Sequence, residues 1–162
     1  MAFGKKMKKS MAIPTQCEWK HHPDDLDAAR AYKDFYGKGL SEAFEMFVEN
    51  ALNYQEDIMF MPLPCFQYYV HAYIDYLLSE KSKGDSDGAS CFFGVVEIRE
   101  ADIRASSDEL RLRISDLLRH IGKKQDWYAA LPEVYGDFAA KTNEALDLIE
   151  KEMPNHRLEH DS

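Results

Sequence analysis

The sequence has few cysteines, and their spacing excludes the structures that cysteines most often build. The 162-residue chain contains three, Cys17, Cys65 and Cys91. An odd number without a C-x-x-C spacing indicates neither a disulfide framework nor a zinc finger. Free, reduced thiols are the simplest interpretation, and they are typical of a cytoplasmic protein.

The sequence also lacks a hydrophobic run suited to crossing a membrane. The longest uncharged stretch, 58–74, is interrupted by Pro62 and Pro64, which a lipid-spanning helix accommodates only at high cost. Residues 1–14 carry lysines but no apolar region of the length that a secretory signal needs. We therefore predict a cytoplasmic protein without membrane contact.

Motifs that would hold a metal or a cofactor are missing as well. The run GDSDG at 84–88 suggests calcium, but an EF-hand loop through it would begin at Lys83 and end at Gly94, neither of which carries a carboxylate. His156 and His160 stand four residues apart but lie in the last seven residues. No G-x-S-x-G, Walker, G-x-G-x-x-G or H-E-x-x-H motif is present. We predict no cofactor, no metal and no catalysis.

Positive charge is scarce outside the N-terminal segment. The chain has 20 Lys and Arg against 29 Asp and Glu. Residues 1–22 hold a surplus of four positive charges, which leaves a net charge of −13 for residues 23–162 of a chain whose total is −9. A negative field of this size repels phosphates and steers basic proteins. Direct nucleic-acid binding is not expected, and a basic protein partner is favoured.

The hydrophobic residues predict a single all-α domain. They make up 45% of the chain, and in successive segments they recur at spacings of three and four. The fold class is an irregular bundle of about six helices within 23–154, preceded by a basic mobile tail, 1–22, and followed by a frayed tail, 155–162. The expected helices begin near Pro23, Ser41, Cys65, Ala89, Ser106 and Pro132.

One segment fits two structures. Residues 91–98, CFFGVVEI, suit either one short buried strand or the middle of a buried helix. Charged residues continue to Arg104 without a turn signal, which favours the helix.

The third expected helix is rich in aromatic residues. Phe66, Tyr69, Tyr73 and Tyr76 follow one face and are predicted to be core, whereas Tyr68 points about a third of a turn away. His71 and Cys65 lie on the same helix. An alternative function is therefore a small ligand-binding or enzymatic domain that uses His71, Cys65 and the neighbouring tyrosines.

The segment from Phe60 to Arg99 resembles a pattern in small bacterial proteins. It reads FMPLPCFQYYVHAYIDYLLSE, then KSKGDSDGASCFFGVVEIR: F-x-Y-Y near a helix start, then A-[YF]-[IL]-x-Y-[LA], a polar loop and another apolar helix. Some proteins of this kind are immunity proteins of contact-dependent growth inhibition systems. The resemblance implies a cytoplasmic, non-catalytic helical protein that binds a cognate protein toxin domain.

The resemblance agrees with the acidic surface that the residues predict. Spacings of three, four and seven align glutamates on the second helix, and like charges at such spacings repel one another unless a partner neutralises them. An ordinary solvated face is the competing interpretation. The predicted partner-binding residues are Glu42, Glu45, Glu49, Glu56, Asp85, Asp87 and Tyr68. A basic, nuclease-type toxin domain is the expected partner, and a scaffold or dimerisation role stays open.

Overall fold

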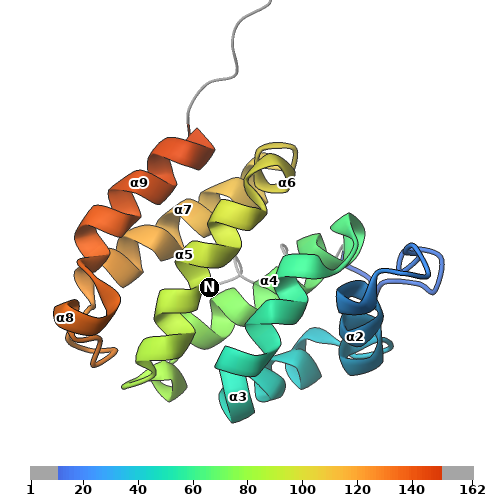
Figure 1. Cartoon of the computed structure of the whole chain (residues 1–162), viewed down its shortest axis with the longest axis horizontal. Coiled ribbons are helices and arrows are strands. Elements are labelled where there is room, and N and C mark those ends of the chain that lie inside the picture. Colours follow the sequence, from blue (N-terminus) through green and yellow to red (C-terminus); the bar gives the residue numbers. More distant parts are fainter. Residues whose placement is uncertain (1–10, 151–162) are drawn as a thin grey trace, which may run out of the picture.

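The computed structural model describes residues 11–150, and every regular element in that range is a helix (Figure 1). This confirms the predicted all-α class and the helical alternative for residues 91–98. The elements are α2 (Leu26–Phe35), α3 (Leu40–Phe60), α4 (Leu63–Leu78), the 3₁₀ turn η2 (Glu80–Ser82), α5 (Ser86–Ile98), α6 (Glu100–Arg104), α7 (Asp108–Lys123), α8 (Pro132–Tyr135) and α9 (Phe138–Glu150).

The aromatic helix α4 supplies the centre of the core. Tyr69 and Tyr73 are fully buried, and the Tyr73 ring stacks on Phe47 of α3 at 4.8 Å between centroids. Buried tyrosine hydroxyls need acceptors. Tyr69 donates to the Lys38 carbonyl at 2.7 Å and Tyr73 to the Gly88 carbonyl at 2.6 Å. The prediction that this helix lies in the core is correct.

Helix α3 is interrupted at Asn50, which the sequence analysis missed. Asn50 has φ −162° and ψ 78°, outside the helical region. Its side-chain Oδ1 accepts the Asn53 amide N–H at 3.1 Å, so Asn50 caps the second half of the helix. The predicted start is also corrected, because the helix begins at Leu40 with Gly39, rather than Ser41, as its N-cap.

The N-terminal segment from Met11 to His22 belongs to the fold, although the sequence analysis assigned it to a mobile tail. Trp19 is 1% exposed and packs edge-on against Tyr32 of α2, with ring centroids 5.7 Å apart. It also contacts Tyr69 of α4 at 5.9 Å. Burial of a tryptophan side chain stabilises the folded state by more than nearby lysines, which stay in solvent, can oppose. The remainder of that predicted tail, 1–10, and the predicted C-terminal tail lie outside the described residues.

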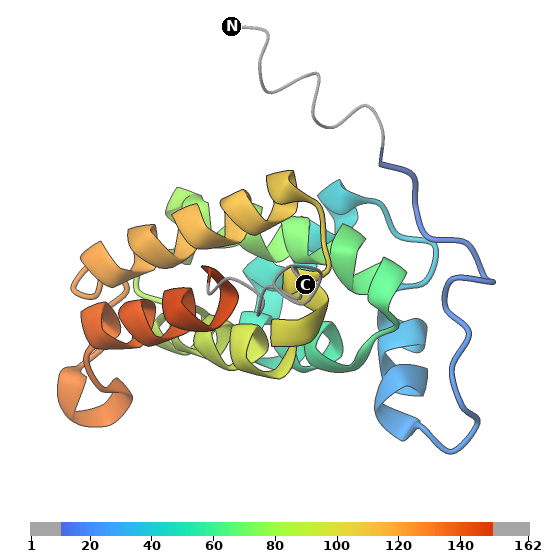
Figure 2. The same ribbon diagram turned by 90° about the horizontal axis from the view of Figure 1, so that it is seen from above.

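The C-terminal half of the chain packs α7 against α9, side by side in Figures 1 and 2. The predicted last helix is divided in two, because Gly136 adopts φ +77° between α8 and α9. The predicted cap at Ser106 is displaced by one residue, since Ser107 Oγ accepts the Leu110 N–H at 3.2 Å. Figure 2 places α2 at one end of the long axis and α8 at the other.

No helix within residues 11–150 is both long enough and apolar enough to cross a membrane.

Candidate functional site

Acidic residues from two separate segments meet beside the break in α3. A hollow of about 380 Å³ is lined on one side by Glu49, Asn50 and Leu52 of α3, and on the other by Asp85 and Asp87. Lys83 also lines it and supplies one positive charge. The sequence analysis could not place the loop acids relative to α3. We call this place, with Glu49, Asp85 and Asp87 around it, the acidic hollow.

The two loop acids at the acidic hollow have different local roles. Asp85 is the N-cap of α5, and its Oδ1 accepts the Gly88 N–H at 2.9 Å. Asp87 is exposed in the first turn of α5, where its charge opposes the positive end of the helix dipole. Its Oδ1 accepts the Tyr135 hydroxyl at 2.8 Å. Asp85 therefore has a structural role, and Asp87 offers its charge to solvent.

Glu56 lies on the second half of α3, beyond the break at Asn50. It forms an ion pair with Arg30 of α2, with 3.5 Å between Nη1 and Oε2. It also acts on Cys91 of α5, since burial, and then the charges of Asp87, Asp85 and Glu56, raise the pKa of the Cys91 thiol to about 11.

The glutamates at the start of α3 are exposed, but they do not form one continuous stripe with Glu56. Glu42 Oε1 accepts the Gly39 N–H at 3.3 Å in a capping box. Glu45 and Glu49 are exposed and have no ion-pair partner among the described residues. The break at Asn50 turns the helix between Glu49 and Glu56, so the spacing of seven does not align those two as it would on a straight helix. The predicted four-residue stripe is therefore wrong in geometry.

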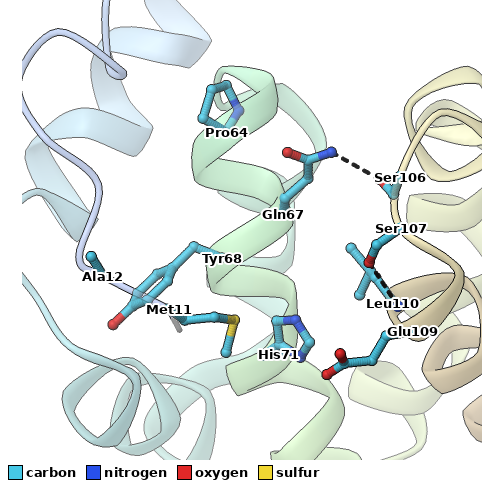
Figure 3. A pocket seen from close by; sticks show the side chains of 10 residues that line it. All are labelled: Met11, Ala12, Pro64, Gln67, Tyr68, His71, Ser106, Ser107, Glu109 and Leu110. Carbon is cyan, nitrogen blue, oxygen red and sulfur yellow. Dashed lines mark hydrogen bonds between the residues drawn. The ribbon is translucent and has the colours of Figure 1, made fainter. Parts of the chain in front are cut away.

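Tyr68 lies elsewhere. It is 8% exposed, so it offers little surface to a partner, and burial raises the pKa of its hydroxyl. Its ring lines a second hollow of about 420 Å³ between α4 and α7, closed on one side by Met11 and Ala12 (Figure 3). We call this the histidine hollow, because His71 lies on its wall with Gln67 and Glu109.

The imidazole ring of His71 is hydrogen-bonded to an arginine of α7. Arg113 of α7 lies with Nη1 at 2.7 Å from His71 Nδ1, and it also pairs with Asp75. A guanidinium donates hydrogen bonds and accepts none, so Nδ1 accepts and the ring proton of a neutral His71 is on Nε2. Arg113 thus fixes both the orientation and the tautomer of the ring.

Cys65 does not join His71. It is fully buried, its thiol is 3.6 Å from the Glu18 carbonyl, and it is absent from the lining of the histidine hollow. Burial raises the pKa of the Cys65 thiol to about 12, so it is protonated at neutral pH. A protonated, buried thiol is a poor nucleophile. The structure gives the predicted Cys65 and His71 combination no shared site.

Within the described part of the chain, no group of three or more His, Cys, Asp or Glu side chains is placed to hold a metal ion. No protein-family model, curated protein or solved structure matches this chain.

Several residues of these sites were missed from the sequence. Arg113 is 42 residues from His71, so no local pattern connects them. Leu52 follows the apolar spacing that an unbroken helix would bury, yet it is 49% exposed. The sequence signal for the break in α3 is Asn50. Asparagine is a favoured N-cap residue, and Asn53, three residues later, is at the position whose backbone N–H an N-cap side chain accepts.

Proposed function

We propose that this chain is a non-catalytic binding domain that neutralises a basic bacterial toxin domain of nuclease type by covering its active face. The observation that carries the proposal is the acidic hollow, where Glu49 of α3 meets Asp87 of α5. Two segments far apart in the sequence thus add their charges on one face. Glu45, one turn before Glu49, is also exposed on the first half of α3.

Electrostatics explains how such a surface would act. A nuclease binds phosphate, so its active face carries positive charge. An acidic surface attracts that face at long range, and complementary charges raise the association rate more than they raise affinity. Salt screens such attraction, so binding weakens as ionic strength rises. Occlusion of this kind requires no catalytic residue in the inhibitor.

The proposal is tested by capture and rescue. Bacterial lysate is passed over the immobilised chain at low and at moderate salt, and the retained protein is identified by mass spectrometry. We expect a basic protein whose expression alone stops growth and whose co-expression with this chain restores it. Retention of no basic protein, or a retained protein without toxicity, would contradict the proposal.

A matched pair of variants connects that binding to the acidic face. Glu45→Lys with Glu49→Lys reverses two exposed charges that have no ion-pair partner among residues 11–150. Glu133→Lys with Glu144→Lys makes the same change in net charge on α8 and α9. We expect the first pair to slow association and the second to leave it nearly unchanged.

A second candidate function is favoured by the histidine hollow. Its wall presents His71, with the tautomer fixed by Arg113, beside Gln67 and the Glu109 carboxylate, while Met11 and Leu110 contribute apolar surface (Figure 3). Such a mixture of apolar wall and converging polar groups suits a small ligand. A His71→Ala variant that folds normally but loses the binding of a small molecule would favour this function over the first.

A further inference from the structure

Large apolar side chains are exposed along the line where α3 meets α5. Leu52 is 49% exposed on the second half of α3, and Ile98 is 53% exposed at the end of α5. Isolated exposed leucines are common on protein surfaces, but a row of apolar side chains with a polar rim marks an interaction site.

The contacts between the two helices show in which direction each runs beside the other. Ala51 packs against Gly88 near the start of both segments, and Met59 packs against Gly94 further along. At the far end, the Arg99 guanidinium donates to the Met61 carbonyl at 2.8 Å. Contacts that advance together along both helices mean that the two run in parallel. Rows of side chains on their exposed sides are therefore neighbours.

We define the α3–α5 seam by the residues along this line. They are Leu52, Glu56 and Met59 of α3, and Asp87, Cys91, Gly94 and Ile98 of α5, which recur at spacings of three and four. Gly94 has no side chain, which lets Met59 pack directly against the backbone of α5. A Cβ at this position would lie 3.3 Å from the Met59 methyl carbon. Met59 and Cys91 are half-buried and form an apolar base.

The charges around the seam are predominantly negative. Glu56 and Asp87 lie within it, Glu49 lies at one end, and Glu97 is exposed on the outer side of α5. Three cations are close: Arg30, which is paired with Glu56, Lys83 at the acidic hollow, and at the far end the buried Arg99, which is paired with Asp102. The apolar row is thus bordered by more acids than bases.

We propose that the α3–α5 seam is the docking surface for a basic amphipathic helix of the protein partner. The helix lays its apolar side chains on Leu52, Met59 and Ile98, and its lysines and arginines meet the acids on either side. This deepens the proposed function, on which it rests, by naming the element of the partner that binds.

An exposed apolar face could bind either a second copy of this chain or a helix of another protein, and the charges around the seam favour the second. A second copy of this chain would bring Glu56 and Asp87 of each copy toward those of the other, and like charges placed together oppose association. A basic helix satisfies the same acids. Because lysine and arginine have apolar stems, such a helix also covers the half-buried Met59 and Cys91 between the acids.

The test uses the whole chain and a synthetic probe. The probe is a helical peptide of about five turns, with leucines on one stripe and lysines and arginines on its flanks. A scrambled peptide of the same composition keeps the charge and removes the apolar stripe. Amide chemical shifts of the ¹⁵N-labelled protein report where each peptide binds. We expect shifts confined to residues 49–60 and 85–98, and binding of the scrambled peptide weaker by about tenfold or more.

Matched variants then distinguish specific binding at the seam from nonspecific hydrophobic binding. Leu52→Ser with Ile98→Ser removes two exposed apolar side chains of the seam, and Leu112→Ser with Leu131→Ser removes two that are 60% and 61% exposed elsewhere. We expect the first pair to weaken binding by about tenfold and the second to leave it unchanged. Thermal melting confirms that each variant is folded.

Three outcomes would overturn the proposal. They are shifts scattered over the surface, equal binding of the scrambled peptide, and dimerisation of the chain through the seam. These results are independent of the capture experiment. Failure to find a toxin leaves binding at the seam measurable, and failure of the peptide to reach the seam leaves toxin rescue measurable.

Discussion

The hydroxyl of Tyr76 donates to the Asp85 carboxylate at 2.6 Å, which ties α4 to the start of α5. The other carboxylate oxygen of Asp85 accepts the Gly88 N–H. Both oxygens of Asp85 are therefore used to hold the fold on the edge of the acidic hollow. A hydrogen bond to a charged acceptor and a helix cap at one residue make this position sensitive to substitution.

We expect Asp85→Ala to lower the free energy of unfolding by about 2 kcal/mol, the combined size of a lost cap and a lost charged hydrogen bond. Urea denaturation followed by circular dichroism measures the change. Tyr76→Phe removes only the hydroxyl bond, so its effect should be smaller. Equal stability of Asp85→Ala and the wild type would show that the cap is dispensable.

The buried carboxyl of Asp57 predicts that stability falls as pH rises. Asp57 is 2% exposed, and burial, followed by the neighbouring Asp34 carboxyl, raises its pKa from 3.8 to about 8. Glu56 acts in the same direction and Arg30 in the opposite one. Between these two pH values the folded protein keeps a proton that the unfolded chain has released. The stabilisation is therefore complete below about pH 4 and declines up to about pH 8.

The decline is measurable as the pH dependence of urea denaturation. One proton of difference between the folded and unfolded states corresponds to at most about 1.4 kcal/mol per pH unit. Asp57→Asn should remove this contribution, so the variant gains stability relative to the wild type as pH rises. Asp27→Asn, an exposed change on α2, serves as the control. An unchanged slope in Asp57→Asn would contradict the assignment of a neutral Asp57.

The thiols should differ sharply in reactivity. Cys17 is exposed, whereas burial raises the pKa of Cys65 to about 12 and that of Cys91 to about 11. With iodoacetamide near pH 8, we expect Cys17 to be modified first, the half-buried Cys91 slowly, and the fully buried Cys65 only after unfolding. Peptide mass spectrometry identifies the modified residue. Rapid modification of Cys65 in the folded protein would revive a nucleophilic role for it.

The N-terminal segment should contribute to stability through Trp19. Trp19→Ala removes a fully buried side chain that contacts α2 and α4, and we expect a loss of about 3–5 kcal/mol. Trp127 is half-buried, so Trp127→Ala should cost less. Thermal or urea unfolding of both variants measures the difference. A Trp19→Ala protein as stable as the wild type would restore the tail interpretation.

Local patterns predicted most of the helices, because the apolar spacing of each segment is strong. In α7, for example, Leu110, Ile114 and Leu118 recur at a spacing of four and are all buried. The break at Asn50 was missed because an asparagine within a helical pattern is only a weak local signal. The residue after the break, Ala51, packs on Gly88 of α5, a tertiary contact that the local pattern cannot place.

The candidate sites were less predictable than the helices. The acidic residues could be selected from the sequence by their charge. That Glu49 and Asp87 line the same hollow depends on how α3 and α5 pack, which the sequence does not show. Trp19 was missed because neighbouring lysines and histidines suggested a solvated tail, and burial of one large ring outweighs them.

The most direct test of the central claim is the rate at which the captured basic protein associates with this chain and with its charge-reversed variants. The account predicts that Glu45→Lys with Glu49→Lys slows association by about tenfold or more and flattens its dependence on salt, while Glu133→Lys with Glu144→Lys changes neither. Equal rates for the wild type and the first pair, at every salt concentration, would contradict binding through the acidic face.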